Sequence, residues 1–268
     1  MNLHDSFLTR LTRLIVGSMM VLSMTIGVAL AQGPSKQSVL LTRLASGNED
    51  QRADVVIELG SMLSAYAAEQ ATVDALSQAL RRDSSPLVRA LAARAMELSR
   101  DERFVPTLLA NLKTEKDISI RKASIYALAY QRSSQVVGNL LPLLKDKKQD
   151  IRAAATFALA EIGDSIARDS LIDLLRKRGK DEDIFARSQA ARGLGKMADP
   201  ASVEALILAL NRDKAQHVRR ASAQALGLIA GKQDAKAVEA LESAKLDGDP
   251  YLVSAAETAL SRINSRNP

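Results

Sequence analysis

Apolar residues recur at spacings of three and four along almost the whole chain, the period of a helix with one buried face. Two kinds of segment alternate. In the first kind an acid is followed five places later by an aliphatic residue, then an arginine, then small residues; it spans 83–96, 115–128, 146–159, 181–194, 213–226 and 247–260. The second kind has leucines at helical spacing and spans 72–80, 105–112, 136–144, 166–175, 203–210 and 238–246. The pattern predicts a helix–turn–helix unit that repeats.

The aliphatic position serves as the anchor of each copy. The anchors are Val88, Ile120, Ile151, Ala186, Val218 and Leu252, and successive anchors lie 31 to 35 residues apart. A weaker copy precedes them near residue 51. A unit of this length cannot bury its apolar face alone and must stack on its neighbours. We therefore expect an all-α fold, a right-handed α-solenoid of about six to seven helix–turn–helix repeats.

The repeat has a recognisable signature in its fifth copy, where Val218-Arg219 is followed by Ala225-Leu226-Gly227. This resembles the short HEAT-like repeat of phycobilisome lyases, and the resemblance covers roughly residues 37 to 264. It implies the solenoid fold for residues 32–268 but says little about function, because that family includes enzymes and plain scaffolds. The fold of the family also implies a concave surface, which we expect the second helix of each unit to form.

The ends of the helices carry their own signals. Asp199-Pro200 and Asp249-Pro250 place a capping side chain before a proline in the first turn, where no backbone donor is lost. Pro142 instead falls late in its segment, where it should end or bend the helix. Lone helices over 37–45 and 250–263 are expected to close the two ends of the stack.

Residues 1–31 differ from the rest of the chain. Arg10 and Arg13 precede an apolar run, which closes on Ala29-Leu30-Ala31 before Gln32. These are the three parts of a secretory signal peptide, so we expect cleavage between Ala31 and Gln32. The alternative is an uncleaved membrane anchor. The chain contains no cysteine, which excludes a lipidated bacterial lipoprotein, disulfides and thiol catalysis. We predict a bacterial periplasmic or secreted protein.

The formal net charge is +6, and the positive excess is concentrated in residues 81–152, which hold 15 basic and 8 acidic residues. Such clusters attract anionic partners. Outside the repeated arginines, the candidate partner-binding residues are Arg81, Arg82, Arg100, Arg103, Lys113, Lys116, Lys145, Lys147 and Lys148. A second basic cluster lies over 176–180. The alternative is that both are ordinary solvated faces.

The repeated acids and arginines favour a structural role. An arginine that follows each anchor can reach an acid or a turn carbonyl of its own or a neighbouring unit, which would tie the units together. Repetition in nearly every copy is typical of packing rather than of a ligand site. The predicted structural ladder consists of Arg89, Arg121, Arg152, Arg187 and Arg219 with Asp83, Asp146, Asp181 and Asp213.

Residues suited to catalysis are scarce. The chain has two histidines, and one of them, His4, lies in the signal segment, so histidine-based triads and metal sites lack members. We expect His217 to be a helix-start residue. The acids of 181–183 and the pair Asp247 and Asp249 fall at turns, where they stabilise helix starts. These patterns predict no catalytic residue, no metal, no cofactor and no enzyme activity.

The sequence thus favours a non-enzymatic scaffold of the bacterial cell envelope. We expect it to bind a protein partner on its concave face or through the basic region 81–152. Nucleic acid is not expected, a membrane is expected only through an uncleaved signal segment, and a monomer is expected. The alternatives are a lyase- or chaperone-like enzyme for an anionic ligand, and a binder of anionic lipid or cell-wall polymer.

Overall fold

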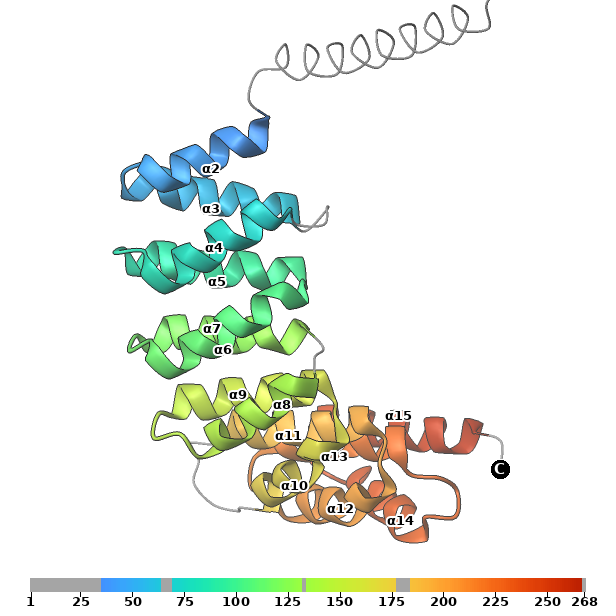
Figure 1. Cartoon of the computed structure of the whole chain (residues 1–268). Helices are drawn as coiled ribbons and strands as arrows, with labels where there is room; N and C mark the ends of the chain where they lie inside the picture. The colour runs from blue at the N-terminus through green and yellow to red at the C-terminus, as the bar shows by residue number, and fades with distance from the viewer. Residues whose placement is uncertain (1–34, 64–68, 132–133, 177–183, 267–268) are drawn as a thin grey trace, which may run out of the picture.

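A computed structural model describes residues 35–63, 69–131, 134–176 and 184–266, and within these ranges every regular element is a helix. The helices form two layers: α2 to α9 (residues 36–162) stack one above another, and α10 to α15 (residues 168–265) continue the array at the lower end of the molecule (Figure 1). The all-α solenoid predicted from the repeat is confirmed. The signal segment with its cleavage site at Ala31 and Gln32, and Asp181 of the predicted ladder, lie outside the described residues.

One layer carries the arginine column, and we call its members the ladder helices: α3 (Glu49–Leu63), α5 (Pro86–Ser99), α7 (Ile118–Tyr130), α9 (Gln149–Ile162), α11 (Ile184–Met197), α13 (Gln216–Ile229) and α15 (Pro250–Ser265). The outer helices form the other layer: α2 (Lys36–Ser46), α4 (Gln70–Arg82), α6 (Val105–Thr114), α8 (Ser134–Leu140), α10 (Arg168–Arg176), α12 (Val203–Arg212) and α14 (Ala235–Ala244). Short 3₁₀ helices are η1 (Glu102–Phe104), η2 (Leu141–Lys145), η3 (Ser165–Ala167) and η5 (Pro200–Ser202).

Local sequence explains where these elements begin and end. The Asp249 side chain accepts a hydrogen bond from the Tyr251 N–H, and Pro250 occupies the first turn of α15. Asp199 caps η5 in the same way, and α12 follows from Val203. The irregularity predicted at Pro142 is confirmed, because α8 ends at Leu140 and the chain continues as the 3₁₀ helix η2.

The core lies between the two layers. The six predicted anchors are all buried, with Val88, Ile151, Val218 and Leu252 fully so. Phe104, which precedes α6, is fully buried as well. Each unit therefore buries its apolar stripe against its partner helix and both neighbouring units, as the repeat requires.

The ladder helices approach one another at backbone distance. A Cβ placed on Gly227 of α13 would lie 2.6 Å from the Cα of Ala259 in α15, and one on Gly193 of α11 would lie 2.7 Å from the Cα of Ala160 in α9. Consecutive ladder helices also contact each other far more extensively than consecutive outer helices do. In a curved two-layer stack, the more closely spaced layer lies on the inside of the curve.

The concave surface therefore belongs to the ladder helices. The expectation that the second helix of each unit forms it was wrong, because the small residues follow the arginine column and draw that layer together. In Figure 1 the outer helices α10, α12 and α14 lie along the lower edge of the molecule, below α11, α13 and α15.

Both ends of the stack expose charged side chains. At the first end, Glu58 of α3 pairs with Lys36 of α2 at 2.7 Å. At the last end, α15 exposes Glu257 and Ser261, and Val253 stands where earlier units have an arginine. Polar end faces keep a solenoid soluble, because no further unit covers them.

Candidate partner-binding face

Ion pairs join successive units along one edge of the stack. In each pair the arginine of one ladder helix contacts the acid at the start of the next unit. The nitrogen–oxygen distances are 2.8 Å for Arg52–Asp83, 2.9 Å for Arg89–Glu115, 3.1 Å for Arg121–Asp146, 2.7 Å for Arg187–Asp213 and 2.7 Å for Arg219–Asp247. Arg152 donates to the carbonyls of Asp146 and Lys147 in its own turn.

Each acid of this ladder also holds its own turn. Asp83 accepts the Ser85 N–H at 2.9 Å and Asp213 accepts the Ala215 N–H at 2.8 Å, in addition to their arginines. Burial by itself raises the pKa of Asp83, but the hydrogen bonds from Arg52 and Ser85 and the nearby guanidinium charges outweigh burial and lower its pKa. The same balance lowers the pKa of Glu115 and that of Asp146.

The predicted basic residues do not form one patch. Seven of the nine lie along the ladder edge, where outer helices end and ladder helices begin: Arg81, Arg82, Lys113, Lys116, Lys145, Lys147 and Lys148, all exposed. Arg100 and Arg103 lie at the opposite edge, because α5 carries the chain across the stack. Arg103 pairs with Asp101 at 2.6 Å, and the Arg100 guanidinium lies 5.8 Å from the Tyr130 ring centroid.

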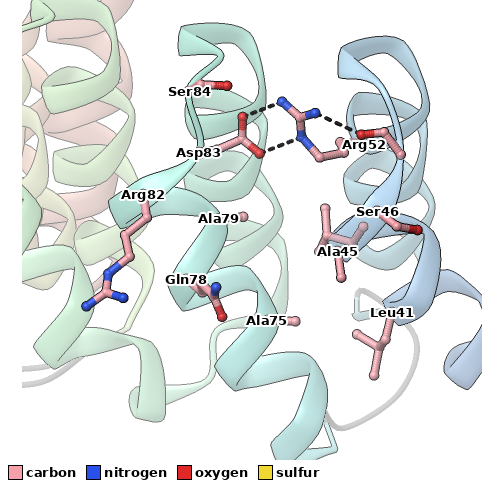
Figure 2. Close-up of a pocket in the computed structure, with 12 residues that line it drawn as sticks. Leu41, Ala45, Ser46, Arg52, Ala75, Gln78, Ala79, Arg82, Asp83 and Ser84 are labelled. Carbon is pink, nitrogen blue, oxygen red and sulfur yellow. Dashed lines mark hydrogen bonds and ion pairs between the residues drawn. The ribbon is translucent and has the colours of Figure 1, made fainter.

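A hollow of about 390 Å³ opens at the ladder edge between α2 and α4. Figure 2 shows its wall, where Arg52 donates both to Asp83 and to the Gly47 carbonyl. Leu41 and the alanines Ala75 and Ala79 contribute apolar lining. Arg52 and Asp83, two of the polar residues that line the hollow, are thus paired with each other, as a structural rung requires.

Aromatic side chains gather on the concave surface. Tyr126 of α7 and Phe157 of α9 pack edge to face with ring centroids 5.3 Å apart, and Tyr130 lies 6.4 Å from Phe157. Phe185 at the start of α11 is 50% exposed and Tyr251 at the start of α15 is 70% exposed. Burial, together with the charges of Asp150 and Glu97, raises the pKa of Tyr126. We call the solvent side of the ladder helices the ladder-helix face.

Sequence reasoning missed this face, although a signal for it exists. Six places after each anchor stand Arg94, Tyr126, Phe157, Arg192, Gln224 and Thr258, a column of large or polar residues that does not repeat. None of these six side chains is fully buried. Residues at this position face solvent and differ from unit to unit. Packing against neighbouring helices therefore does not restrict them, as it restricts the buried positions of the repeat.

The residues weighed for catalysis have ordinary surroundings. His217 is exposed in the first turn of α13. Asp247 accepts from Arg219, and Asp249 accepts from both Arg220 and the Tyr251 N–H. Across the described ranges, no group of three or more histidine and acidic side chains is placed to hold a metal ion. In those same ranges, no helix is long and apolar enough to cross a membrane.

These features define a HEAT-repeat solenoid with an open inner face. The family model for HEAT repeats matches residues 38–129, 105–182 and 178–261, and the chain belongs to this family. It is similar to phycocyanobilin lyase subunit beta of Thermosynechococcus vestitus, with 28% identity over 44% of this chain and 53% of the relative. It is also 26% identical to the bilin biosynthesis protein PecE of Nostoc sp., over 67% of this chain and 68% of the relative. The match to the first relative thus spans about half of that protein's length.

Solved structures agree on the fold. The complex of CpcE and CpcF of phycocyanin lyase from Nostoc sp. matches 87% of this chain and 96% of the matched chain, with a TM-score of 0.53 at 20% identity. An engineered protein matches 87% of this chain and 69% of its own, with a TM-score of 0.55 at 19% identity. The predicted resemblance to phycobilisome lyases is confirmed.

The expectation that the chain is not an enzyme is corrected by these relatives. They are a lyase subunit and a protein of bilin biosynthesis, and a phycocyanin lyase shares the fold. The lack of a familiar catalytic motif was therefore insufficient ground for excluding enzymatic work. A protein that belongs to a lyase as one of its subunits need not carry such a motif itself.

Proposed function

We propose that the chain is a HEAT-repeat scaffold that binds a protein partner on its ladder-helix face and that it works in the bacterial cell envelope. The observation that carries the binding surface is the aromatic group of Tyr126, Tyr130 and Phe157, extended by the exposed Phe185. Aromatic side chains and arginines dominate the binding energy of protein interfaces. The phycocyanin lyase that shares this fold is a complex of two proteins, CpcE and CpcF, and this supports a protein partner.

Charge at the ladder edge supports the same partner class. The exposed lysines Lys113, Lys145 and Lys147 border the ladder-helix face without belonging to it. Rim charges of this kind steer association and set its rate more than its affinity. Reversing these three charges should slow association with the partner at low salt and leave the dissociation rate nearly unchanged. If the same variant instead loses binding to liposomes or to cell-wall polymer, the basic edge binds a lipid or a polymer rather than the protein partner.

Site-specific photo-crosslinking tests the surface. A photoreactive phenylalanine analogue at Phe185 on the ladder-helix face should give a discrete crosslinked product in cells. The same analogue at Ile166 in η3, which is 62% exposed and follows the end of α9, is the matched control. A product at Ile166 with none at Phe185 would move the interface off the ladder helices.

The envelope location rests on the signal segment and is tested separately. Cell fractionation should recover the protein outside the cytoplasm with Gln32 as its first residue. Replacing Ala29 and Ala31 by bulky residues should retain the longer form. A full-length cytoplasmic protein would remove the envelope role and leave the binding face unaffected.

A second candidate function is that of a subunit in a lyase for an anionic ligand. The relatives named as a lyase subunit and a bilin biosynthesis protein favour it. Titrating the purified protein with phycocyanobilin tests this candidate. A saturable change in the pigment spectrum, weakened by Arg192→Gln on the ladder-helix face, is expected, and an unchanged spectrum with and without the protein contradicts it.

A further inference from the structure

A groove runs between α13 and α15 on the ladder-helix face. It holds a cavity of about 480 Å³, and residues of both helices line it, among them Arg220 and Gln224 of α13 and Tyr251, Thr258 and Arg262 of α15. We propose that this groove binds an extended acidic peptide segment of the protein partner. The proposal rests on the proposed function, because it assigns one subsite to the partner-binding face.

Two arginines line the groove: the charge of Arg220 is paired with Asp249, and the charge of Arg262 has no ion-pair partner within the described part of the chain. Arg220 donates from Nε and Nη2 to the two carboxylate oxygens of Asp249 at 2.6 and 2.7 Å, and its guanidinium lies 4.7 Å from the Tyr251 ring centroid. Its Nη1 has no hydrogen-bond partner among the described residues, and the side chain of Arg262 has none there either. Arg220 is thus held in place with a free donor, which lowers the entropy cost of binding a carboxylate.

These arginines are departures from the repeat. Arg220 stands two places after its anchor, where other units have Ala90, Lys122, Ala153, Ser188 and Ser254. Arg262 stands ten places after its anchor, where other units have Leu98, Tyr130, Glu161, Lys196 and Leu228. No other pair of adjacent ladder helices in the described part brings an arginine to each of these two positions. Packing common to all units does not account for them.

The remainder of the groove suits a peptide main chain. Ala255 and Ala259 keep its floor low and apolar, since neither side chain extends beyond Cβ. Gln224, Ser254 and Thr258 line its walls, and their side chains make no hydrogen bond within the described part of the chain. An amide and two hydroxyls can both donate to carbonyls and accept from N–H groups, which a lipid tail does not require.

The length of the groove sets the length of the segment. Tyr251 and Arg262 lie eleven residues apart on α15, which corresponds to about 16 Å of helix. An extended peptide advances about 3.3 Å per residue, so roughly five residues span this distance. An acid at each end of such a segment would meet one arginine, with the Tyr251 ring beside the first.

Peptide titration tests the inference with the purified protein. The probe is Ac-Glu-Thr-Val-Thr-Glu-NH₂, followed by backbone NMR shifts of Gln224, Ser254 and Thr258; the matched control peptide has glutamine in place of both glutamates. The acidic peptide should bind with shifts confined to α13 and α15, and the control peptide should bind at least about 10-fold more weakly, as expected when charge-assisted bonds are lost.

Two variants sharpen the result. Arg262→Gln should weaken the acidic peptide about 10-fold, while Arg212→Gln, an equal charge change at an exposed site on α12 away from the groove, should leave binding unchanged. Equal binding of both peptides, or equal loss in both variants, overturns the proposal. Tighter binding of inorganic pyrophosphate than of the peptide overturns it in favour of a phosphate ligand.

The remaining outcomes separate this inference from the proposed function. Concentration-dependent self-association of the protein that Arg262→Gln abolishes would assign the groove to a second copy and overturn the peptide. If the protein crosslinks at Phe185 but binds no peptide, the groove is not a peptide site and the proposed partner-binding face stands. If the protein binds the peptide but gives no crosslink at Phe185, the groove is a peptide site and the wider ladder-helix face is not the partner-binding surface.

Discussion

Arg187 and Asp213 form the most buried ion pair in the described part of the chain. Nε of Arg187 lies 2.7 Å from one carboxylate oxygen and Nη2 lies 3.1 Å from the other, and the two side chains are 5% and 3% exposed. The pair joins α11 to the turn that precedes α13. Water cannot screen either charge there, so each depends on the other.

Breaking this pair should strongly destabilise the fold. Arg187→Met leaves the Asp213 carboxylate buried without its guanidinium, and we expect a loss of about 3–5 kcal/mol in the free energy of unfolding. Urea unfolding measures it. Arg94→Met, which removes a 65% exposed arginine paired with Glu97, is the control and should cost less than about 1 kcal/mol. If both variants lose a similar amount of unfolding free energy, the fold does not depend specifically on the buried pair of Arg187 and Asp213.

Acid should weaken the ladder. The pKa values of Asp83, Glu115 and Asp146 are lowered in the folded protein, so the unfolded chain binds protons at a higher pH than the folded one. Their contribution to stability is fully present above the ordinary values of 3.8 for Asp and 4.5 for Glu, and it is lost as the pH falls below them.

The measurement is the urea midpoint between pH 6 and pH 2. Asp83→Asn should lower stability near neutral pH and flatten the acid limb of the curve. Asp150→Asn, at a side chain 67% exposed and 3.8 Å from Lys122, should leave the shape of the curve nearly unchanged. If the urea midpoint of the wild type does not decrease as the pH is lowered below 4, the lowered pKa values of these acids do not stabilise the fold.

Replacing glycine by alanine should destabilise the protein at Gly227 and stabilise it at Gly138. In Gly227→Ala the new Cβ would lie 2.6 Å from the Ala259 Cα, so α13 and α15 must separate, at a cost of about 1–3 kcal/mol. In Gly138→Ala on α8 nothing lies within 4 Å, and the variant should be stabilised by about 0.5–1 kcal/mol, because alanine loses less backbone freedom on folding. Thermal unfolding compares them, and a stabilised Gly227→Ala would refute close helix contact.

The Tyr126 hydroxyl should lose its proton at a higher pH than an ordinary tyrosine does. Its pKa is raised above the ordinary 10.0, first by burial and then by Asp150 and Glu97. The folded state therefore keeps its proton where the unfolded state releases it, and stability falls as the pH rises through 10 toward the folded pKa. The difference in ultraviolet absorbance between the wild type and Tyr126→Phe should show a transition above pH 10. A transition at or below pH 10 would contradict the packing of this ring.

The fold was predictable because it depends on columns that repeat. Val88 and its counterparts are buried in each described unit, and acids and arginines meet across five junctions, so each copy gave independent evidence. Pro142 was predictable for a different reason, since a missing backbone donor ends a helix regardless of its surroundings.

The concave surface and its contents were not predictable in the same way. Which layer lies inside depends on the small difference in spacing caused by Gly193 and Gly227, and this appears only when helices are packed. The basic residues looked like one cluster because Arg100 and Lys113 are near in sequence, although a whole helix, α6, separates their edges. Tyr126 and Phe157 looked like isolated aromatics until their units were stacked.

The regular offset of the ion pairs has a consequence for how such a molecule changes over generations. The arginine and acid of four junctions are separated by 25 to 28 residues, and each of these junctions pairs a guanidinium with a carboxylate. A gene segment that encodes one whole unit can therefore be duplicated or deleted, and the new neighbours still match. An array built in this way can be lengthened or shortened in whole units without a new kind of contact at the junctions.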